Sequence, residues 1–291
     1  MTAGDGCHGQ GAGSGVLYVV ATPIGNLEDI TLRALRVLKE ADLIACEDTR
    51  LTQKLLNHYA IPTPTVSYHA HNEEERAAQL VAELRAGKKI ALVSDAGTPA
   101  ISDPGFRLVS LAIENGIAVV PLPGPAALVA ALAASGLPTE SFRFGGFLPA
   151  KGGQRRDAIK EIANSPHTEV FYEAPHRLKE TMQDVVGILG ASRPVVVARE
   201  ITKIHEEFLR GSAAEVLQSL NARGEIKGEI TLLIGRGQAA KPEVPAGFTA
   251  QQRLQEIMAV EKLDQKSALK KLAREMGVSK SEAYRALQRN R

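Results

Sequence analysis

The sequence predicts an α/β fold with two α/β domains, followed by a small helical domain. Three observations predict it. Short apolar segments alternate with amphipathic helical patterns through residues 15–122, which is typical of a mainly parallel sheet. In residues 123–236 some strand patterns follow one another directly, which indicates a mixed sheet. Residues 250–291 have a helical pattern throughout.

Length and composition are those of a globular protein. A chain of 291 residues is long enough for more than one domain, and its hydrophobic (44%) and charged (23%) fractions are ordinary. It contains no run of about 18 apolar residues, and its first fourteen residues lack an apolar segment. The two cysteines, Cys7 and Cys46, are too few for a disulfide framework. We therefore expect a cytoplasmic protein with no membrane segment.

Five strands and four helices are predicted in the first domain. Each strand is a short apolar run, and several runs are apolar at nearly every position, as expected of strands covered on both faces. The strands are Val16–Ala21, Leu43–Cys46, Thr65–Tyr68, Lys89–Val93 and Ala118–Leu122. The helices between them are Leu32–Lys39, Leu51–Tyr59, Glu73–Ala86 and Phe106–Asn115.

The second domain begins where the segment Leu122–Pro125 breaks the chain. An Ala-rich helix is predicted at 126–135, and three more helices at 156–163, 177–189 and 214–222. The predicted strands are Phe142–Gly145, Val170–Tyr172, Val195–Arg199, Glu206–Arg210 and Ile230–Ile234. The predicted organisation is a flexible tail (1–14), two α/β domains (15–122 and 123–236), a linker (237–249) and a basic helical domain (250–291).

Loops that follow the strands of the first domain are unusually rich in small, polar, glycine and proline residues. In an open parallel sheet, ligands bind beyond the carboxyl ends of the strands. The longest such loop, Ser94–Gly105, combines two glycines, two prolines and two aspartates. Asx-type turns without a ligand would explain it too, but the concentration of such loops at one edge favours a binding site. The glycine pattern at 4–9 does not follow a strand, so it does not indicate a dinucleotide site.

Charged side chains that follow other strands have two interpretations, a role in the site or a structural role. His69 and His71 could ligate a metal, but no second cluster completes such a site, so a polar role at the cleft edge is favoured. Glu173 follows a later strand and could act in the site or form a surface ion pair. Glu200, which follows Arg199, could act there or simply pair with that arginine.

Nine segments together resemble a known family. ATPIGNLEDIT, CEDTR, HAHNE, LVSDAGTPAISDPG, PLPGPAAL, GFLPAKG, FYEAPHR, AREITK and KGEITLLI occur in this order from Ala21 to Ile234. The chain resembles the ribosomal RNA small subunit methyltransferase I family, among the tetrapyrrole methylase-like enzymes that use S-adenosyl-L-methionine (SAM). The resemblance implies a SAM cleft between the two α/β domains and a homodimer. It also implies 2′-O-methylation of a cytidine in 16S ribosomal RNA near the decoding centre, in free RNA or in the 30S particle.

The resemblance also implies which residues bind SAM. Small residues and backbone groups dominate the set. The set comprises Pro23, Ile24, Gly25, Asp95, Ala96, Gly97, Thr98, Ser102, Ala126, Ala127, Tyr172, Ala198, Gly228, Glu229 and Ile230.

Methyl transfer to a ribose hydroxyl needs alignment above all, and a base or a positive charge would assist it. The candidates for that role are Asp48, Arg50, His69, His71, Glu173 and Glu200. Arg155 and Arg156 are candidates for phosphate contacts, or for a solvated helix start.

The last 42 residues carry ten Lys/Arg and five Asp/Glu, whereas the rest of the chain has 25 and 28. Their pattern predicts helices at 266–276 and 280–288 joined by a turn at Gly277, as in helix-turn-helix units. Excess positive charge suits RNA phosphates. The candidate RNA contacts here are Lys270, Lys271, Lys280 and Arg285. A dimerisation or stabilising role is the alternative.

Two other functions stay open at this point. One is methylation of a small molecule such as a tetrapyrrole, against which the basic end and the TPIGN loop argue. The other is a non-catalytic RNA-binding assembly factor, which the dense strand-end loops disfavour.

Overall fold

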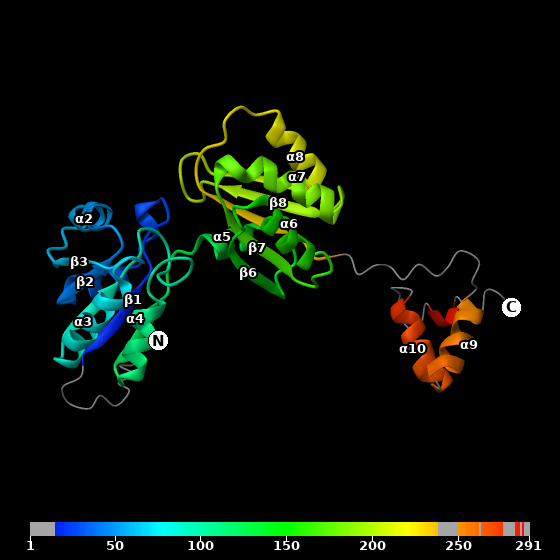
Figure 1. Ribbon diagram of the computed structural model, residues 1–291, viewed down its shortest axis with the longest axis horizontal. Helices are drawn as coiled ribbons and strands as arrows, with labels where there is room; N and C mark the ends of the chain where they lie inside the picture. The colour runs from blue at the N-terminus through cyan, green and yellow to red at the C-terminus, as the bar shows by residue number, and fades with distance from the viewer. Residues whose placement is uncertain (1–14, 238–249, 262, 276–282, 286, 288–291) are drawn as a thin grey trace. The chain divides into compact units, whose positions relative to one another are not determined.

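The structure is a computed structural model that describes residues 15–237, 250–261, 263–275, 283–285 and 287 (Figure 1). These residues form two compact units. One consists of residues 15–162 and 167–235, and the other of residues 163–166 together with the described residues from 236 onward. The predicted tail 1–14, the linker after residue 237 and Lys280 lie outside the described residues.

The first sheet is parallel throughout, with strand order β3-β2-β4-β1-β5. Its strands are β1 (Val16–Val20), β2 (Leu43–Cys46), β3 (Thr65–Ser67), β4 (Lys89–Leu92) and β5 (Ala118–Leu122). A 3-10 turn at Leu27–Asp29 follows β1. The helices are α1 (Leu32–Glu40), α2 (Thr49–His58), α3 (Glu73–Arg85) and α4 (Phe106–Glu114).

Side-chain alternation along these strands builds two cores. Ile44 and Cys46 point to the face that α1 and α2 cover, whereas Ala45 points to the face that α3 and α4 cover. Since both faces are buried, the strands are apolar at successive positions, as the sequence predicted. The result is a sheet between two helical layers whose strands all end at the same edge.

The second sheet is mixed, as predicted, with strand order β6-β7-β10-β8-β9. β6 pairs with β7 in parallel, and the other pairs are antiparallel. Its strands are β6 (Phe142–Phe147), β7 (Thr168–Glu173), β8 (Pro194–Arg199), β9 (Glu207–Ser212) and β10 (Ile230–Ile234).

The two faces of this sheet are covered differently. One face packs against α6 (Gly152–Glu161), α7 (Leu178–Leu189) and α8 (Ala213–Asn221). The other face packs against α5 (Ala127–Ser135), together with Ile24 from the loop after β1. Ile24 therefore links the first strand-end loop to the core of the second sheet. The expected α/β class with two sheets is confirmed.

The second unit contains α9 (Ala250–Glu261) and α10 (Gln265–Glu275). Leu254, Ile257 and Leu272 form its core, which Ala283 from the helical residues 283–285 joins. In the part of the chain that the structure describes, no helix is both long and apolar enough to cross a membrane.

Candidate active site

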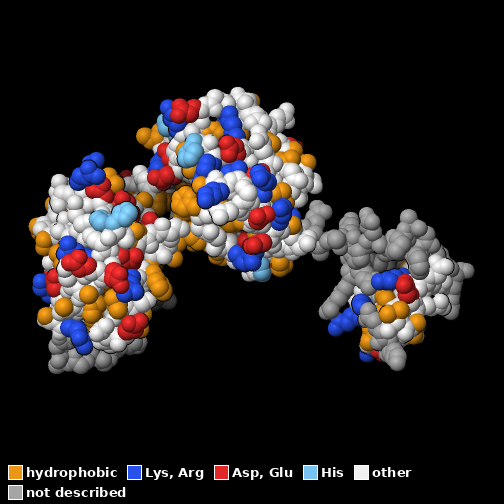
Figure 2. Space-filling view, viewed as in Figure 1, with side chains coloured by type: hydrophobic (Ala, Val, Ile, Leu, Met, Phe, Trp, Pro, Cys, Tyr) orange, Lys and Arg blue, Asp and Glu red, His pale blue; other side chains and the backbone are white. Residues whose placement is uncertain are grey.

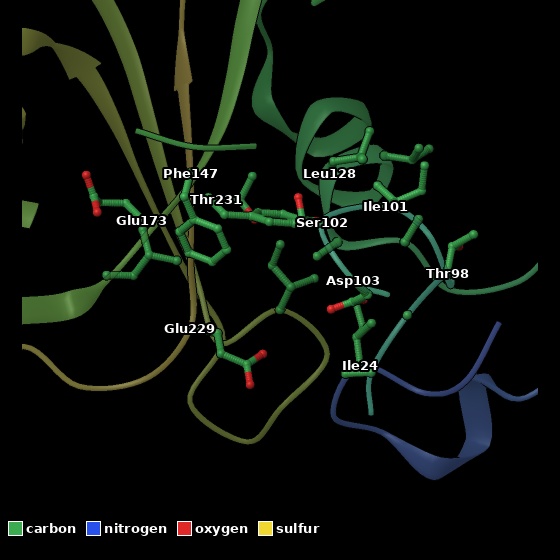
Figure 3. A pocket seen from close by; sticks show the side chains of 18 of the residues that line it. Ile24, Thr98, Ile101, Ser102, Asp103, Leu128, Phe147, Glu173, Glu229 and Thr231 are labelled. Atoms are coloured by element: carbon green, nitrogen blue, oxygen red, sulfur yellow. The ribbon is translucent and has the colours of Figure 1, made fainter. Parts of the chain in front are cut away.

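A cavity of about 630 Å³ lies within the first unit, beyond the carboxyl ends of the parallel strands (Figure 3). One side is formed by the loop after β4 and the start of α5. The other side is formed by the end of β7 and the start of β10, with Phe147 and Ile201. The volume is within the range of pockets for drug-sized ligands, about 300–1,000 Å³.

Hydrogen bonds join three strand-end loops into one wall of this cavity. Thr22 and Gly97 form a two-bond antiparallel bridge, with N to O distances of 2.9 and 3.0 Å. The hydroxyl of Thr22 donates to the carbonyl of Ser94 at 3.1 Å, and that of Thr98 donates to the carbonyl of Pro125 at 3.2 Å. The loops after β1, β4 and β5 are thus held in fixed positions relative to one another.

The loop after β4 contains strained backbone. Gly97 has φ of +82°, and Ala100 and Ser102 have φ of +67° and +63°, values that non-glycine residues rarely adopt. Such conformations persist where surrounding contacts impose them, and they cluster at functional sites. A Cβ at Gly97 would lie 3.3 Å from Cγ2 of Ile24. The tight loop therefore brings backbone groups to the cavity surface.

The opposite wall of the cavity is aromatic, and the backbone of Gly228 there lies close to a neighbouring side chain. The Tyr172 ring packs edge-on against Phe144 and Phe147, with ring centroids 4.9 and 5.6 Å apart. Phe147 is 56% exposed, so much of its ring faces open space. Gly228 has φ of +96°, and a Cβ there would lie 2.5 Å from the Glu200 side chain. This wall offers ring surface and exposed main chain to a ligand.

Carboxylates give the cavity its charge. Figure 3 shows Asp103 and Glu229 projecting toward the open space from opposite sides, whereas the Glu173 carboxylate points away from Asp103. Burial raises the pKa of Asp103 to about 6, and the charges of Glu47 and Asp95 act in the same direction. Burial likewise raises the pKa of Glu47. Asp103 therefore titrates closer to neutrality than an ordinary aspartate.

Eleven of the expected SAM residues line this cavity. They lie in the loops after β1 and β4, at the start of α5, at the end of β7 and at the start of β10: Ile24, Ala96, Gly97, Thr98, Ser102, Ala126, Ala127, Tyr172, Gly228, Glu229 and Ile230.

The other four expected SAM residues do not line the cavity. Pro23 and Gly25 flank Ile24, and the Lys203 stem covers Gly25. Asp95 accepts a hydrogen bond from the backbone N–H of Asp48 at 3.0 Å, so it ties the loops after β2 and β4 together. Ala198 is fully buried in β8, where it packs in the core with α5.

Among the catalytic candidates, only Glu173 lines the cavity. Its buried carboxylate accepts hydrogen bonds from Thr181 Oγ1 and Ala174 N–H, each at 2.7 Å, and pairs with Arg177 at 2.7 Å. These contacts occupy the carboxylate of Glu173. Its role is therefore to hold the end of β7 to the start of the next helix.

Asp48 and Arg50 pair with each other. Arg50 donates two hydrogen bonds to the Asp48 carboxylate, at 3.1 and 2.7 Å. Asp48 also caps α2 by accepting from Arg50 N–H at 2.8 Å. These hydrogen bonds lower the pKa of Asp48 to about 2, which makes it a poor proton acceptor at neutral pH.

His69, His71 and Glu200 lie outside the cavity lining. The two histidines follow β3, the edge strand, and their rings are 5.9 Å apart. Glu200 accepts from the backbone N–H of Glu229 at 2.9 Å and pairs with Lys203 at 2.9 Å; both contacts lower its pKa. Within the described residues, no group of three or more His, Cys, Asp and Glu side chains could hold a metal ion.

The expected phosphate contact of Arg155 disagrees with the structure. The Arg155 side chain is only 5% exposed, and its Nε donates to Asp184 at 2.8 Å. This arginine fastens α6 to α7 and is not available to a phosphate. Arg156 is 53% exposed. In the second unit, Lys270 and Arg285 are exposed and Lys271 is partly buried.

Sequence reasoning missed several lining residues. Most are apolar or small: Ile101, Leu128, Val129, Phe147, Ala174, Pro175, Ile201 and Thr231. Their residue types are those of any hydrophobic core. The one sequence signal for them was their position next to a strand-end loop. Asp103 was seen in the loop motif but was not chosen as a site residue, although an aspartate within that loop was a visible signal.

A family model described as tetrapyrrole (corrin/porphyrin) methylases matches residues 16–217. The chain therefore belongs to the tetrapyrrole methylase family, which is the class that the two sheets and the cavity beyond the strand ends define.

The curated relatives narrow this further. Ribosomal RNA small subunit methyltransferase I of Halalkalibacterium halodurans is 52% identical over 93% of this chain and 93% of its own length. The protein of that name from Vibrio cholerae is 51% identical over 80% of this chain and 82% of its own length. Within the tetrapyrrole methylases, the chain belongs to the ribosomal RNA small subunit methyltransferase I family.

Solved structures agree with the fold. The cobalamin biosynthetic enzyme cobalt precorrin-4 methyltransferase matches with a TM-score of 0.57 and 20% identity, over 76% of this chain and 94% of that one. A uroporphyrin-III C-methyltransferase from Thermus thermophilus, complexed with S-adenosylhomocysteine, matches with a TM-score of 0.54 and 22% identity, over 76% and 97%. At this identity the likeness concerns the fold alone.

Proposed function

We propose that this protein is a SAM-dependent methyltransferase that methylates the 2′-hydroxyl of a cytidine in small-subunit ribosomal RNA, near the decoding centre. The observation that supports it most is the 52% identity, over 93% of both chains, to a relative named ribosomal RNA small subunit methyltransferase I. The strand-end cavity supports the enzymatic part of the proposal, since it offers a concave site large enough for a small ligand.

The cavity residues fit SAM. Alanines and glycines at the turn after β4 and at the start of α5 leave room for a ligand against the backbone. The carboxylates of Asp103 and Glu229 face the space, which suits a ligand that carries a positive sulfonium. When bound, SAM supplies a methyl group on a good leaving group.

The chain's own residues then have two tasks. The hydrogen-bonded wall of three loops positions the reactants, and positioning supplies most of the rate enhancement in such a transfer. Asp103 would take the proton of the acceptor hydroxyl, because it lines the cavity and its pKa is about 6. We favour Asp103 over Asp48, one of the six candidates, since the Asp48 carboxylate is held by Arg50.

The basic second unit is proposed to add RNA affinity, and the enzyme is proposed to act as a homodimer. Lys266 and Lys270 are exposed on α10 and can neutralise phosphates. Analytical ultracentrifugation of the purified chain tests the dimer.

The deciding experiment is methylation of free 16S RNA, small subunits and whole ribosomes with radiolabelled SAM, followed by mapping of the modified nucleotide. A 2′-O-methylcytidine near the decoding centre is the expected product. Transfer to a tetrapyrrole and not to RNA would replace this function with small-molecule methylation. SAM-independent RNA binding without transfer would replace it with an assembly role.

A further inference from the structure

A second cavity, of about 540 Å³, adjoins the first. The two share the lining residues Pro175 and Gly228, so they are neighbours on the side formed by the second sheet. His176 and Lys179 contribute from the turn and helix that follow β7, and residues 224–227 contribute from the loop before β10.

Lys179 is rigidly held in this second cavity. Its Nζ donates to the backbone carbonyls of Arg223 at 2.8 Å and Gly224 at 3.2 Å. An ammonium has three donors, so one remains after these two bonds. Neutral carbonyls do not cancel its charge. A fixed cation therefore lies at the loop that forms one side of the cavity.

Lys227 adds a second cation, on an exposed side chain. Its ammonium lies 3.1 Å from the Glu225 carboxylate, and both side chains are 76% exposed. An ion pair this exposed is weak, so the ammonium can exchange Glu225 for another anion. His176 is also exposed on the same cavity.

Apart from Glu225, which lines this cavity itself, the nearby carboxylates pair with arginines. Arg223 pairs with Glu207 through two bonds of 2.6 Å, and Arg199 approaches the same carboxylate at 3.4 Å. Glu173, at the junction with the first cavity, pairs with Arg177. The charge of Lys179 is therefore left for a ligand.

The residue types also limit what the ligand can be. The first cavity presents the rings of Tyr172 and Phe147, which suit stacking with a base. Among the described residues that line the second cavity there is no Phe, Tyr or Trp, and the apolar side chains are Pro175 and Ile226. It suits a sugar-phosphate group better than a base.

We propose that this second cavity binds the phosphodiester next to the acceptor nucleotide, with Lys179 and Lys227 as its cationic contacts. The inference rests on the proposed RNA methyltransferase function. The acceptor ribose would enter the first cavity, and the adjoining phosphate would follow the shared edge at Pro175 and Gly228.

The test pairs a charge change in the protein with one in the RNA. Methyl transfer is measured on a single-stranded RNA oligonucleotide that carries the acceptor cytidine. Each neighbouring phosphate is replaced in turn by an uncharged methylphosphonate. For the wild type, one of the two replacements is expected to raise KM roughly three- to tenfold, the effect of losing one phosphate contact. In Lys227→Glu, KM for the unmodified RNA rises similarly, and the same replacement then adds less than about twofold.

Lys160→Glu is the matched control, since Lys160 on α6 is likewise exposed (63%) and its described ion pair is with Asp157. It should leave both KM and the methylphosphonate effect unchanged. Lys179→Met, with an intact fold by circular dichroism, should reproduce the loss of coupling. If wild-type enzyme methylates RNA but neither phosphate couples to Lys227 or Lys179, the inference is wrong and the proposed function stands. If wild-type enzyme methylates none of the oligonucleotide, free 16S RNA, small subunits and whole ribosomes, the proposed function itself is wrong.

Discussion

At the residue scale, Asp103 is the clearest case in which environment determines chemistry. It lies within a strained loop, and the neighbouring Ser102 has φ of +63°. Burial and the negative charges of Glu47 and Asp95 disfavour its ionised form. A carboxyl with a pKa of about 6 is ionised at neutral pH and still basic enough to accept a proton.

The first prediction concerns this carboxyl. Below its pKa Asp103 is protonated and cannot accept a proton, so kcat/KM should rise with pH through about 6 and level off above it. Asp103→Asn should remove this limb and lower kcat by about 10²- to 10⁴-fold, as loss of a general base does. The measurement is the pH dependence of methyl transfer at saturating SAM.

Glu47→Gln is the matched control. It removes a nearby negative charge, so the pKa of Asp103 falls and the limb should move to lower pH without disappearing. A limb that stays at the same pH in both variants would assign the titration to another group.

Arg155 carries the second prediction. Because the largely buried Asp184 would keep only a 4.0 Å contact with Arg156, Arg155→Met should lower the free energy of unfolding by about 3 kcal/mol. Arg156→Met, at an exposed position, should change it by less than about 0.5 kcal/mol. Urea denaturation followed by circular dichroism measures both. A variant of Arg155 with normal stability and weakened RNA binding would restore the original expectation for this residue.

At the scale of elements, the start of α5 is the segment most sensitive to substitution, because it forms part of both a core and a cavity wall. Ala126 and Ala127 line the cavity, while Ala131 and Leu132, one turn later, pack in the core of the second sheet. The predominantly apolar helix thus has one side in the core and another on the cavity, and its residue types do not show which side meets a ligand.

The third prediction uses that geometry. Ala127→Trp should fill the cavity and weaken SAM binding at least about a hundredfold, since a close contact with a ligand leaves no room for an indole. Ala133→Trp, on an exposed position of the same helix, should bind SAM normally. Isothermal titration calorimetry measures the affinities, and thermal denaturation verifies that both variants fold. Equal affinities would place SAM elsewhere.

Most strands and helices could be predicted from sequence to within one or two residues. β2, β5 and β10 begin and end where predicted, because short apolar runs between polar turns leave little choice. α2 begins at Thr49 and not at the predicted Leu51, because Asp48 caps it. α6 begins at Gly152 although the prediction began at 156, since glycines are poor indicators of a helix start.

The candidate site was predictable only in part. Polar and glycine-rich strand ends indicated the loops that form the cavity, because parallel strands end at one edge. Contacts within those loops were not predictable: Asp95 binds the backbone of Asp48, and Asp103 faces the cavity, although both are aspartates of one motif. Apolar lining residues such as Phe147 resemble core residues, so only the folded arrangement identifies them.

At the scale of the whole chain, charge is distributed unevenly. Residues 250–291 have five more basic than acidic residues, while the rest of the chain has three more acidic than basic. On the described surface of the second unit, Lys and Arg side chains lie beside hydrophobic ones (Figure 2). A compact core of its own allows this unit to present charge without depending on the sheets.

The last prediction follows from this division of charge. Deleting residues 250–291 should weaken binding of small-subunit RNA and reduce the slope of log affinity against log salt, because each lost phosphate contact lowers that slope by about one. SAM affinity should stay unchanged, since every residue of the cavity lies in the first unit.

Lys266→Gln combined with Lys270→Gln is the matched variant: both side chains are exposed, and the core of Leu254, Ile257 and Leu272 is kept. Filter binding at several salt concentrations should give a smaller slope in this variant, by about two. An unchanged slope in both the deletion and the double variant would leave the second unit with a stabilising role and no part in RNA affinity.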